Sequence, residues 1–329
     1  MRGWFLSYRA ASTLGESVRQ TGRVDRKDVD AMRGIFTIVF VLTIGVVPAQ
    51  ARNLATLGGM DFFVAPNGND LRQNRGKRKT QAANDCTKKS SPCRTPQHAC
   101  EEAMNKWDYG GISEPFIRLS AGRYSSGCIL TGQPVGAHTV NIVGEQSRDL
   151  SQSCTTLSQA ERVVIDVSSG AAFDIQDLAI AVVRCMTIQG QGTAFNCRQT
   201  PASDIAYIKF GGTAPLGRGV TANDECGINL GGTIWIGNDV SIFLLANNLS
   251  RIVVADNLPI VATTPVSVGY FALSYQTAIV DIRGGVTITG PITSSAGSRV
   301  FRNGSIFSGG LPLPGGCTQT DPLQPGTCW

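Results

Sequence analysis

Short β-strand patterns that end in glycine constrain this chain more than any other feature of its sequence. Apolar and polar residues alternate, with β-branched residues prominent, in residues 116–121, 139–144, 162–168, 233–237 and 286–290. From Gly170 onward, glycines recur about 20 residues apart, at positions 190, 211, 231, 269, 290 and 309. The one longer interval, between positions 231 and 269, reads as two ordinary steps. Alternation with a period of two is typical of strands, and glycine permits the tight corners that would join them.

A step of about 20 residues without intervening helices predicts a parallel β-solenoid, whose coils stack about 4.8 Å apart. An alternating α/β fold is disfavoured because its parallel strands need crossover helices. One convincing amphipathic helix is predicted, at about residues 95–108, with Thr95 as its cap and Pro96 in its first turn. We therefore expect an all-β fold, a single right-handed parallel β-helix with an N-terminal capping α-helix and about nine coils.

Residues 1–51 have the character of a leader. Residues 34–47 form an uncharged, apolar run that is followed by Pro48, and Ala49 and Ala51 have the spacing of a cleavage site. This pattern is typical of a secretory signal with its core at residues 32–51, and the run is short for a membrane span. An uncleaved anchor is the alternative. Residues 1–31 are polar and precede a second methionine, Met32, which is an alternative start.

The predicted domain organisation follows from these patterns. Residues 1–51 are the leader, residues 52–310 the β-helix domain, and residues 311–329 a tail rich in proline, glycine and cysteine. The net charge of +5 falls to +2 without the leader, which removes seven basic and four acidic residues. This balance gives no indication of a nucleic-acid partner. Two histidines exclude a histidine-rich metal site.

All ten cysteines follow the leader. An even number of cysteines behind an export signal predicts disulfides. The pairs Cys185–Cys197 and Cys317–Cys328 are close in sequence and are candidates, but the connectivity stays open. No Cys-x-x-Cys pair is present, which argues against a zinc ribbon or a thioredoxin-like site.

Three motifs in residues 62–144 carry a family resemblance. They are a strand with a Pro-Asn-Gly-Asn-Asp turn at residues 63–70, a Pro-x-x-Thr-x-x-x-Ala segment at residues 92–99, and a strand followed by Gly-Arg-Tyr at residues 117–124. This region resembles the N-terminal part of the right-handed parallel β-helix proteins of the pectin lyase-like superfamily. The resemblance implies the architecture alone, because members include polysaccharide lyases, glycoside hydrolases, pectin esterases, phage tailspikes and non-catalytic surface proteins.

The catalytic signatures of that superfamily are absent. The Trp-x-Asp-His element of pectate lyases has no counterpart, since Trp235-Ile236-Gly237 lacks the acid and the histidine. Among the polygalacturonase motifs, only Arg-Ile-Lys has a partial match, in which Tyr207 replaces the arginine before Ile208 and Lys209. No family active site can therefore be transferred to this chain.

Three residues remain as candidate catalytic groups. Asp204 and Asp224 are 20 residues apart, which equals the step between the recurring glycines. If this step is one coil of the solenoid, the two side chains would stack about 5 Å apart on the outer wall. Paired carboxylates can serve as acid and nucleophile, or they can hold Ca²⁺, a cofactor that is expected only if the protein is a lyase. Lys209 and Arg218 lie between them and could neutralise a uronate, or Lys209 could act as a base. The alternative is that these are solvated turn residues.

Five aromatic residues could form a sugar-stacking strip or, alternatively, belong to the core of the coils: Trp235, Phe243, Tyr270, Phe271 and Tyr275.

The sequence thus predicts an exported β-helix protein that is secreted, periplasmic or at the cell surface. It would associate with a polysaccharide or cell-surface glycan through one face of the solenoid, without a recognisable family active site. The alternative is a polysaccharide lyase or glycoside hydrolase that acts on an acidic polysaccharide through an atypical carboxylate and lysine site. Whether the protein is an enzyme stays open, as does its oligomeric state. Neither a nucleic-acid partner nor a stable membrane span after signal cleavage is expected.

Overall fold

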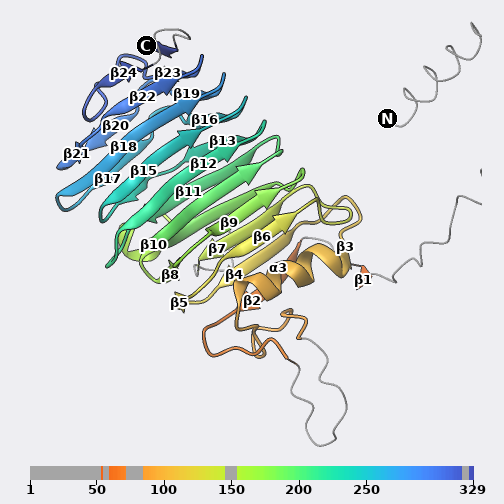
Figure 1. Ribbon diagram of the computed structural model, residues 1–329. Helices are drawn as coiled ribbons and strands as arrows, with labels where there is room; N and C mark the ends of the chain where they lie inside the picture. Colours follow the sequence, from red (N-terminus) through yellow and green to blue (C-terminus); the bar gives the residue numbers. More distant parts are fainter. Residues whose placement is uncertain (1–52, 55–58, 72–83, 145–153, 321–325) are drawn as a thin grey trace, which may run out of the picture. The chain divides into compact units, whose positions relative to one another are not determined.

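The computed structural model describes residues 53–54, 59–71, 84–144, 154–320 and 326–329, all within the compact unit of residues 52–329. This unit is a parallel β-solenoid of about eight turns (Figure 1). The prediction of an all-β parallel solenoid is confirmed. The predicted signal segment, and with it the leader of residues 1–51, lies outside the described residues.

Each full coil of the solenoid has three walls, and we number them in chain order. Wall one consists of β2 (Met60–Val64), β4 (Pro115–Leu119), β7 (Val140–Gly144), the first parts of β10 (Ala181–Arg198) and β11 (Ser203–Phe210), β13 (Gly227–Gly231), β16 (Arg251–Val254), β19 (Ile279–Ile282), β23 (Ser305–Phe307) and β25 (Thr327–Cys328). Wall two consists of β5 (Gly122–Tyr124), β8 (Val163–Asp166), the middle of β10, the end of β11, β14 (Ile234–Ile236), β17 (Pro259–Ala262) and β20 (Thr287–Thr289).

Wall three consists of β6 (Cys128–Thr131), β9 (Ala171–Gln176), the end of β10, β12 (Leu216–Asn223), β15 (Val240–Ala246), β18 (Val266–Tyr275), β21 (Ile292–Ser294), β22 (Ser298–Phe301) and β24 (Cys317–Gln319). The short β1 (Asn53–Leu54) and β3 (Trp107–Asp108) pair in a separate two-stranded sheet. Strands β24 and β25 extend walls three and one, so part of the predicted tail belongs to the solenoid.

The coils are longer than the step of about 20 residues that the glycines indicated. Along wall one, Val183 pairs with Ile205, Ile205 with Leu230, Leu230 with Val254 and Val254 with Ile282, and every one of these intervals exceeds that step. Because each turn uses more residues, the chain makes about eight turns instead of nine. The spacing of the glycines underestimates the coil length because these glycines occupy different positions in successive coils.

Glycine serves some corners, and at the corner between walls three and one it follows β6 as Gly132, with φ +76°, but the later coils use other residues there at positive φ. In those coils the corner is built from residues with φ between +47° and +69°: Asp177, Leu178, Gln199, Asp224, Glu225, Asn248, Leu249, Gln276, Thr277, Arg302 and Asn303. Backbone N–H groups bond to the same corner of the next coil, as from Gln199 to the Asp224 carbonyl at 2.9 Å. These bonds between coils favour a left-handed conformation that costs a non-glycine residue about 1 kcal/mol or more.

Replacing Leu249 by glycine should raise the free energy of unfolding by up to about 1 kcal/mol. Leu249 has φ +60° and is 58% exposed, so the change relieves backbone strain with little loss of packing. Ile129 is a matched control because it is 54% exposed but lies in a strand without a positive φ. Ile129→Gly should lower stability in the same urea titration. If both variants are destabilised equally, the corner stores no such strain.

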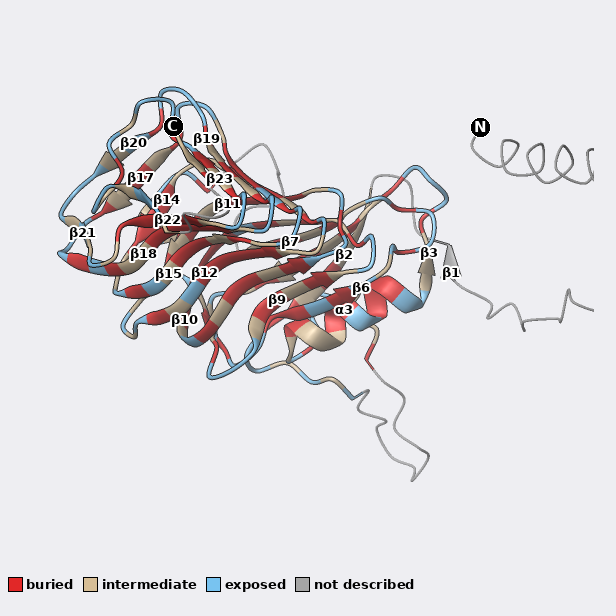
Figure 2. Cartoon of the chain, turned by 45° about the horizontal axis from the view of Figure 1, so that its top comes forward, coloured by how far each residue is buried: buried red, intermediate tan, exposed pale blue. Residues whose placement is uncertain are grey.

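Buried apolar side chains from all three walls fill the interior. In Figure 2, the red stretches along the strands mark these buried residues. Five fully buried phenylalanines form a ladder through successive coils: Phe173, Phe195, Phe210, Phe243 and Phe271. Successive ring centroids are 5.3, 6.1, 5.5 and 5.3 Å apart. These spacings suit aromatic packing and link the coils into one continuous core.

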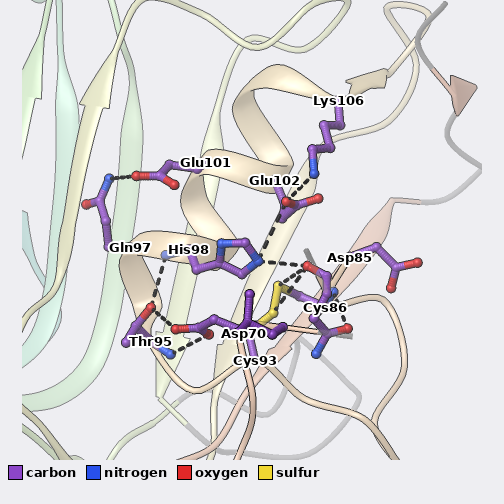
Figure 3. Close-up of polar contacts among 12 residues, drawn as sticks. Asp70, Asp85, Cys86, Cys93, Thr95, Gln97, His98, Glu101, Glu102 and Lys106 are labelled. Carbon is purple, nitrogen blue, oxygen red and sulfur yellow. Dashed lines mark hydrogen bonds and ion pairs between the residues drawn. A yellow bond between two sulfur atoms is a disulfide. The ribbon is translucent and has the colours of Figure 1, made fainter. Parts of the chain in front are cut away.

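The predicted helix is α3 (Pro96–Asn105), and it packs against β2, β4 and β6 (Figure 1). The Thr95 hydroxyl accepts a hydrogen bond from the His98 amide at 3.3 Å, as expected of an N-cap (Figure 3). The helix is shorter than expected because Trp107 and Asp108 form β3. That α3 acts as a cap on the solenoid stays a prediction. A second, short helix, α4 (Leu157–Ala160), precedes β8.

All ten cysteines form disulfides: Cys86–Cys93, Cys100–Cys128, Cys154–Cys185, Cys197–Cys226 and Cys317–Cys328. The candidate pair Cys317–Cys328 is confirmed. The candidate pair Cys185–Cys197 is wrong because Cys185 lies at the corner after the wall-one part of β10, in the outer cluster with Cys154, whereas Cys197 lies on wall three and bonds to Cys226.

Candidate functional site

The register does not stack Asp204 on Asp224. Asp204 lies on wall one opposite Asn229, whose Nδ2 donates to its Oδ1 at 3.0 Å. Asp224 lies at the corner between walls three and one, where it accepts a hydrogen bond from Asn248 Nδ2 at 2.6 Å. The expected stacking is wrong because the neighbour of Asp204 in the next coil lies 25 residues later in the chain. A catalytic role for either carboxylate stays a prediction.

Lys209 lies on wall two opposite Trp235. Its side chain is 13% exposed, and Nζ lies 2.5 Å from Glu161 Oε1, which follows α4 in sequence. Beside this pair, Trp235 packs in a small outer cluster with the Cys154–Cys185 disulfide and Ala160. Lys209 is therefore engaged in holding the segment around α4 to the wall, and a catalytic role for it also stays a prediction.

The five candidate aromatic residues divide between the core and the surface. Phe243 and Phe271 are fully buried in the phenylalanine ladder, and Trp235 is only 6% exposed. Tyr270 and Tyr275 are partly exposed on β18, on wall three. These two tyrosines are therefore the members of the set that a ligand on wall three could contact.

Wall three carries an open groove of about 710 Å³ on its outer face. The groove crosses β9, β10, β12 and β15, and its lining includes Asp174, Gln191, Thr193, Asn196, Arg218 and Ser241. We call this hollow the wall-three groove. It passes over four successive coils, so at about 4.8 Å per coil its floor is about 14 Å long. This length suits a chain-like ligand better than a single small molecule.

The groove follows from a break in the strand pattern. The register between β10 and β12 shifts between Gly190 and Thr193. In β12, the residues from Gly219 to Ala222 are all buried, where a flat strand would alternate. Such irregularities bend a strand, which gives wall three a hollow outer face. Gly217 is needed here, since a Cβ would lie 2.1 Å from the Gln191 carbonyl oxygen of the preceding coil.

Arg218 is the exposed cation of the wall-three groove. It lies opposite Thr193 on one side and Ile242 on the other. Its guanidinium makes no ion pair or hydrogen bond with any residue that the structure describes. A guanidinium group without such partners can bind a carboxylate or sulfate through two parallel hydrogen bonds.

Asp174 is the acidic counterpart of Arg218 in the groove, but its carboxylate is already engaged. Oδ1 accepts from Asn196 Nδ2 at 2.7 Å and Oδ2 from Gln176 Nε2 at 2.6 Å. The Arg198 guanidinium lies 3.8 Å from the same Oδ2. These contacts fix a row of amide and carboxylate groups along the groove, which can present hydrogen-bonding groups to sugar hydroxyls.

The residues that pair in register with Arg218 in the following coils form a column that ends at an aromatic ring. Ile242 follows Arg218 in β15, and Tyr270 follows Ile242 in β18. The Arg299 guanidinium lies 5.4 Å from the centroid of the Tyr270 ring. Nearby, Tyr275 stacks on Phe301 at 4.6 Å. Burial, with a smaller contribution from Tyr270, raises the pKa of Tyr275 above its ordinary value, and the nearby Arg299 opposes this shift in part.

Two of the arginines on wall one are paired with aspartates, whereas Arg184 on the same wall is exposed and makes no ion pair with a described residue. Arg118 Nε lies 2.6 Å from Asp61 Oδ1. Arg251 Nη2 lies 2.6 Å from Asp281 Oδ2, which is also 3.8 Å from Arg283. These two paired guanidinium groups offer less to a charged ligand than the guanidinium of Arg218 in the wall-three groove does.

Carboxylates are scarce among the described residues that line the wall-three groove. Asp174 is the sole carboxylate among the described lining residues. Glycoside hydrolysis ordinarily needs two carboxyl groups, and a Ca²⁺ site needs several oxygen ligands. The sequence pointed to Arg218, but not to Asp174 or Asn196. The signal that could have found these two is their separation by 22 residues, which is one coil.

No protein-family model, no curated protein and no solved structure matches this chain. Among the residues that the structure describes, no helix combines the length and the apolar character needed to span a membrane.

Proposed function

We propose that this chain is an exported β-solenoid protein of the pectin lyase-like type that binds a polysaccharide along the wall-three groove. The observation that carries the proposal is the guanidinium of Arg218, which has no partner among the described residues and lies in an open groove about 14 Å long. An anionic polysaccharide, with a carboxylate or sulfate on its sugars, suits that cation best.

The rest of the groove supports a sugar ligand. Hydroxyl and amide groups, such as those of Thr193, Asn196 and Ser241, pair with sugar hydroxyls. Tyr270 offers a ring beyond Ile242 in the same column. A polar lining with a few well-placed directional groups is typical of sites that fix the orientation of a ligand.

Five disulfides support export, because disulfides persist in oxidising surroundings outside the cytosol. The predicted signal at residues 32–51 points the same way. The protein would then meet polysaccharides or cell-surface glycans in the medium, in a periplasm or at a cell surface.

The alternative is a lyase or hydrolase that acts on an acidic polysaccharide. In that case Arg218 would neutralise a uronate, and Asp204, Asp224 or Lys209 would have to act from outside the groove. The single carboxylate among the described residues of the groove and the separate positions of these three residues favour binding without cleavage.

A polysaccharide panel tests the proposal. Immobilised neutral, uronate-rich and sulfated polysaccharides are offered to the protein, with and without Ca²⁺, and scored for binding and for new reducing or unsaturated ends. We expect salt-sensitive binding to an anionic member and no cleavage. Binding to no member would overturn the proposal, and cleavage would establish the enzymatic alternative.

A further inference from the structure

The outer face of wall three carries a second arginine without a charged partner, beyond the end of the wall-three groove. Arg299 lies in β22, beside Leu273 of β18 and Thr318 of β24 in the register. Its side chain is partly exposed and makes no ion pair or hydrogen bond with any residue that the structure describes. Because its Nε is buried, the two terminal nitrogens are the ones left for a ligand.

Three partly exposed aromatic rings accompany this guanidinium on β18 and β22. The guanidinium carbon lies 5.4 Å from the centroid of the Tyr270 ring. Tyr275 stacks on Phe301, its partner in the register, at 4.6 Å and with an angle of 3° between the ring planes. Burial raises the pKa of Tyr275, and Arg299 opposes that rise in part, so the positive charge lies close to this phenol as well. We call Tyr270, Tyr275, Arg299 and Phe301 the β22 patch.

The contact with Tyr270 holds the guanidinium of Arg299 without neutralising it. A guanidinium over a ring face gains a cation–π attraction, which restricts its orientation. The ring supplies no negative charge, unlike the aspartates that pair with Arg118 and Arg251. The terminal N–H groups of Arg299 can therefore form two parallel hydrogen bonds with a carboxylate or a sulfate.

The β22 patch continues the wall-three groove. The lining of the groove reaches Ile242 in β15, and Tyr270 pairs with Ile242 in the next coil. Strands β18 and β22 are the next two strands of the same wall, and they lengthen the face open to a ligand from about 14 Å to about 24 Å. Arg218 in β12 and Arg299 in β22 are three coils apart, which is about 14 Å along the axis.

We propose that the β22 patch is a second anion-binding subsite for the same ligand, so that wall three selects a polysaccharide with charged groups on many of its sugars. This inference rests on the proposed function, because it assigns one continuous sugar chain to the groove and the patch. Arg218 binds one carboxylate or sulfate, and Arg299 binds another about three coils away. The rings of Tyr270 and Tyr275 contact the sugars that lie between β18 and β22.

Two charged contacts on one sugar chain make the charge density of the ligand important. Once the first anionic group is bound, the second guanidinium meets its anion within the same complex, at a high effective concentration. A polysaccharide with an occasional charge gains only one of these contacts. A uronate homopolymer or a densely sulfated chain gains both, at any position along the wall.

The length of the oligosaccharide distinguishes two linked subsites from one. The probes are polygalacturonate and heparin, which represent uronate and sulfated chains, together with an octasaccharide and a disaccharide of each. The octasaccharide can reach both arginines, whereas the disaccharide is too short to do so. We expect Arg299→Gln to weaken the binding of the octasaccharide at least about tenfold, but that of the disaccharide no more than about twofold. Isothermal titration of the full chain measures both affinities.

Arg302→Gln is the matched control for Arg299→Gln. Arg302 is exposed at the corner between walls three and one and is not part of the β22 patch. Its replacement changes the net charge equally, and it should alter the affinity for the octasaccharide less than about twofold. Circular dichroism checks that each variant is folded. If Arg299→Gln does not fold, Arg299→Lys carries the same test against Arg302→Lys, because lysine keeps the charge but cannot form two parallel hydrogen bonds.

The outcomes separate this inference from the proposed function. If the Arg299 variant binds the octasaccharide as tightly as the Arg302 variant does, while Arg218→Ala still weakens binding, the second subsite is wrong and the wall-three groove alone binds the ligand. If the parent chain binds neither polymer, the second subsite is wrong together with the anionic preference of the groove.

Discussion

Replacing Phe210 by alanine should lower the free energy of unfolding by about 3–5 kcal/mol. Phe210 is fully buried at the middle of the phenylalanine ladder and contacts Phe195 and Phe243, at centroid distances of 6.1 and 5.5 Å. The coils pack on one another, so a cavity at this level removes contacts both above and below. Urea denaturation followed by circular dichroism measures the loss.

The matched control for that experiment is Phe307→Ala. Phe307 is 37% exposed at the end of β23, so its truncation should cost less than about 1 kcal/mol. A solenoid is stabilised largely by contacts between neighbouring coils, so the Phe210 variant should also broaden the transition or divide it into two. Equal, small effects of the two substitutions would contradict a continuous aromatic core.

Replacing Arg218 by alanine should reduce the affinity for the anionic polysaccharide by at least about tenfold, which corresponds to about 1.4 kcal/mol. The guanidinium has no partner among the described residues, so its charge-assisted bonds are available to the ligand. The variant should also show a weaker dependence of binding on salt concentration, because one charge contact is lost. Isothermal titration with an oligosaccharide at two salt concentrations measures both effects.

Arg251→Ala provides the control for Arg218. Arg251 is exposed to a comparable degree but is paired with Asp281 on wall one, 2.6 Å away. Its removal changes the net charge equally while leaving the groove intact, so the affinity should change less than twofold. If both variants lose affinity to the same extent, binding depends on net charge and not on the wall-three groove.

The fold could be predicted because local chemistry repeats in every coil. Alternating β-branched residues specify the strands, and Gly190 and Gly211 mark one corner. The coil length could not be predicted, because the corner between walls three and one uses residues such as Leu178 and Gln276 in left-handed conformations. Hydrogen bonds between coils stabilise that corner, and these bonds cannot be predicted from the sequence.

The candidate site depended on this coil length. The shorter step that the glycines indicated brings Asp204 and Asp224 together, whereas the actual register brings Asp204 to Asn229. Arg218 was identified from its charge alone. Its position in a groove depends on the strand irregularity near Gly190, which only the register between β10 and β12 shows.

The disulfide connectivity, too, could be predicted only in part from the sequence. Cys317 and Cys328 pair as their proximity in sequence indicates, but Cys197 pairs with Cys226, 29 residues away. A separation of about one coil places two residues side by side in a solenoid, so the three bridges over 28, 29 and 31 residues follow from the coil length, whereas the bridges over 7 and 11 residues join near neighbours in sequence.

The most direct test of the account is a crystal structure of the protein with the tightest-binding oligosaccharide from the panel. We predict sugar density along the outer face of wall three, with a carboxylate or sulfate on the guanidinium of Arg218 and a sugar ring near Tyr270. Density on wall one or wall two, with the wall-three groove empty, would contradict the assignment of that groove as the binding site.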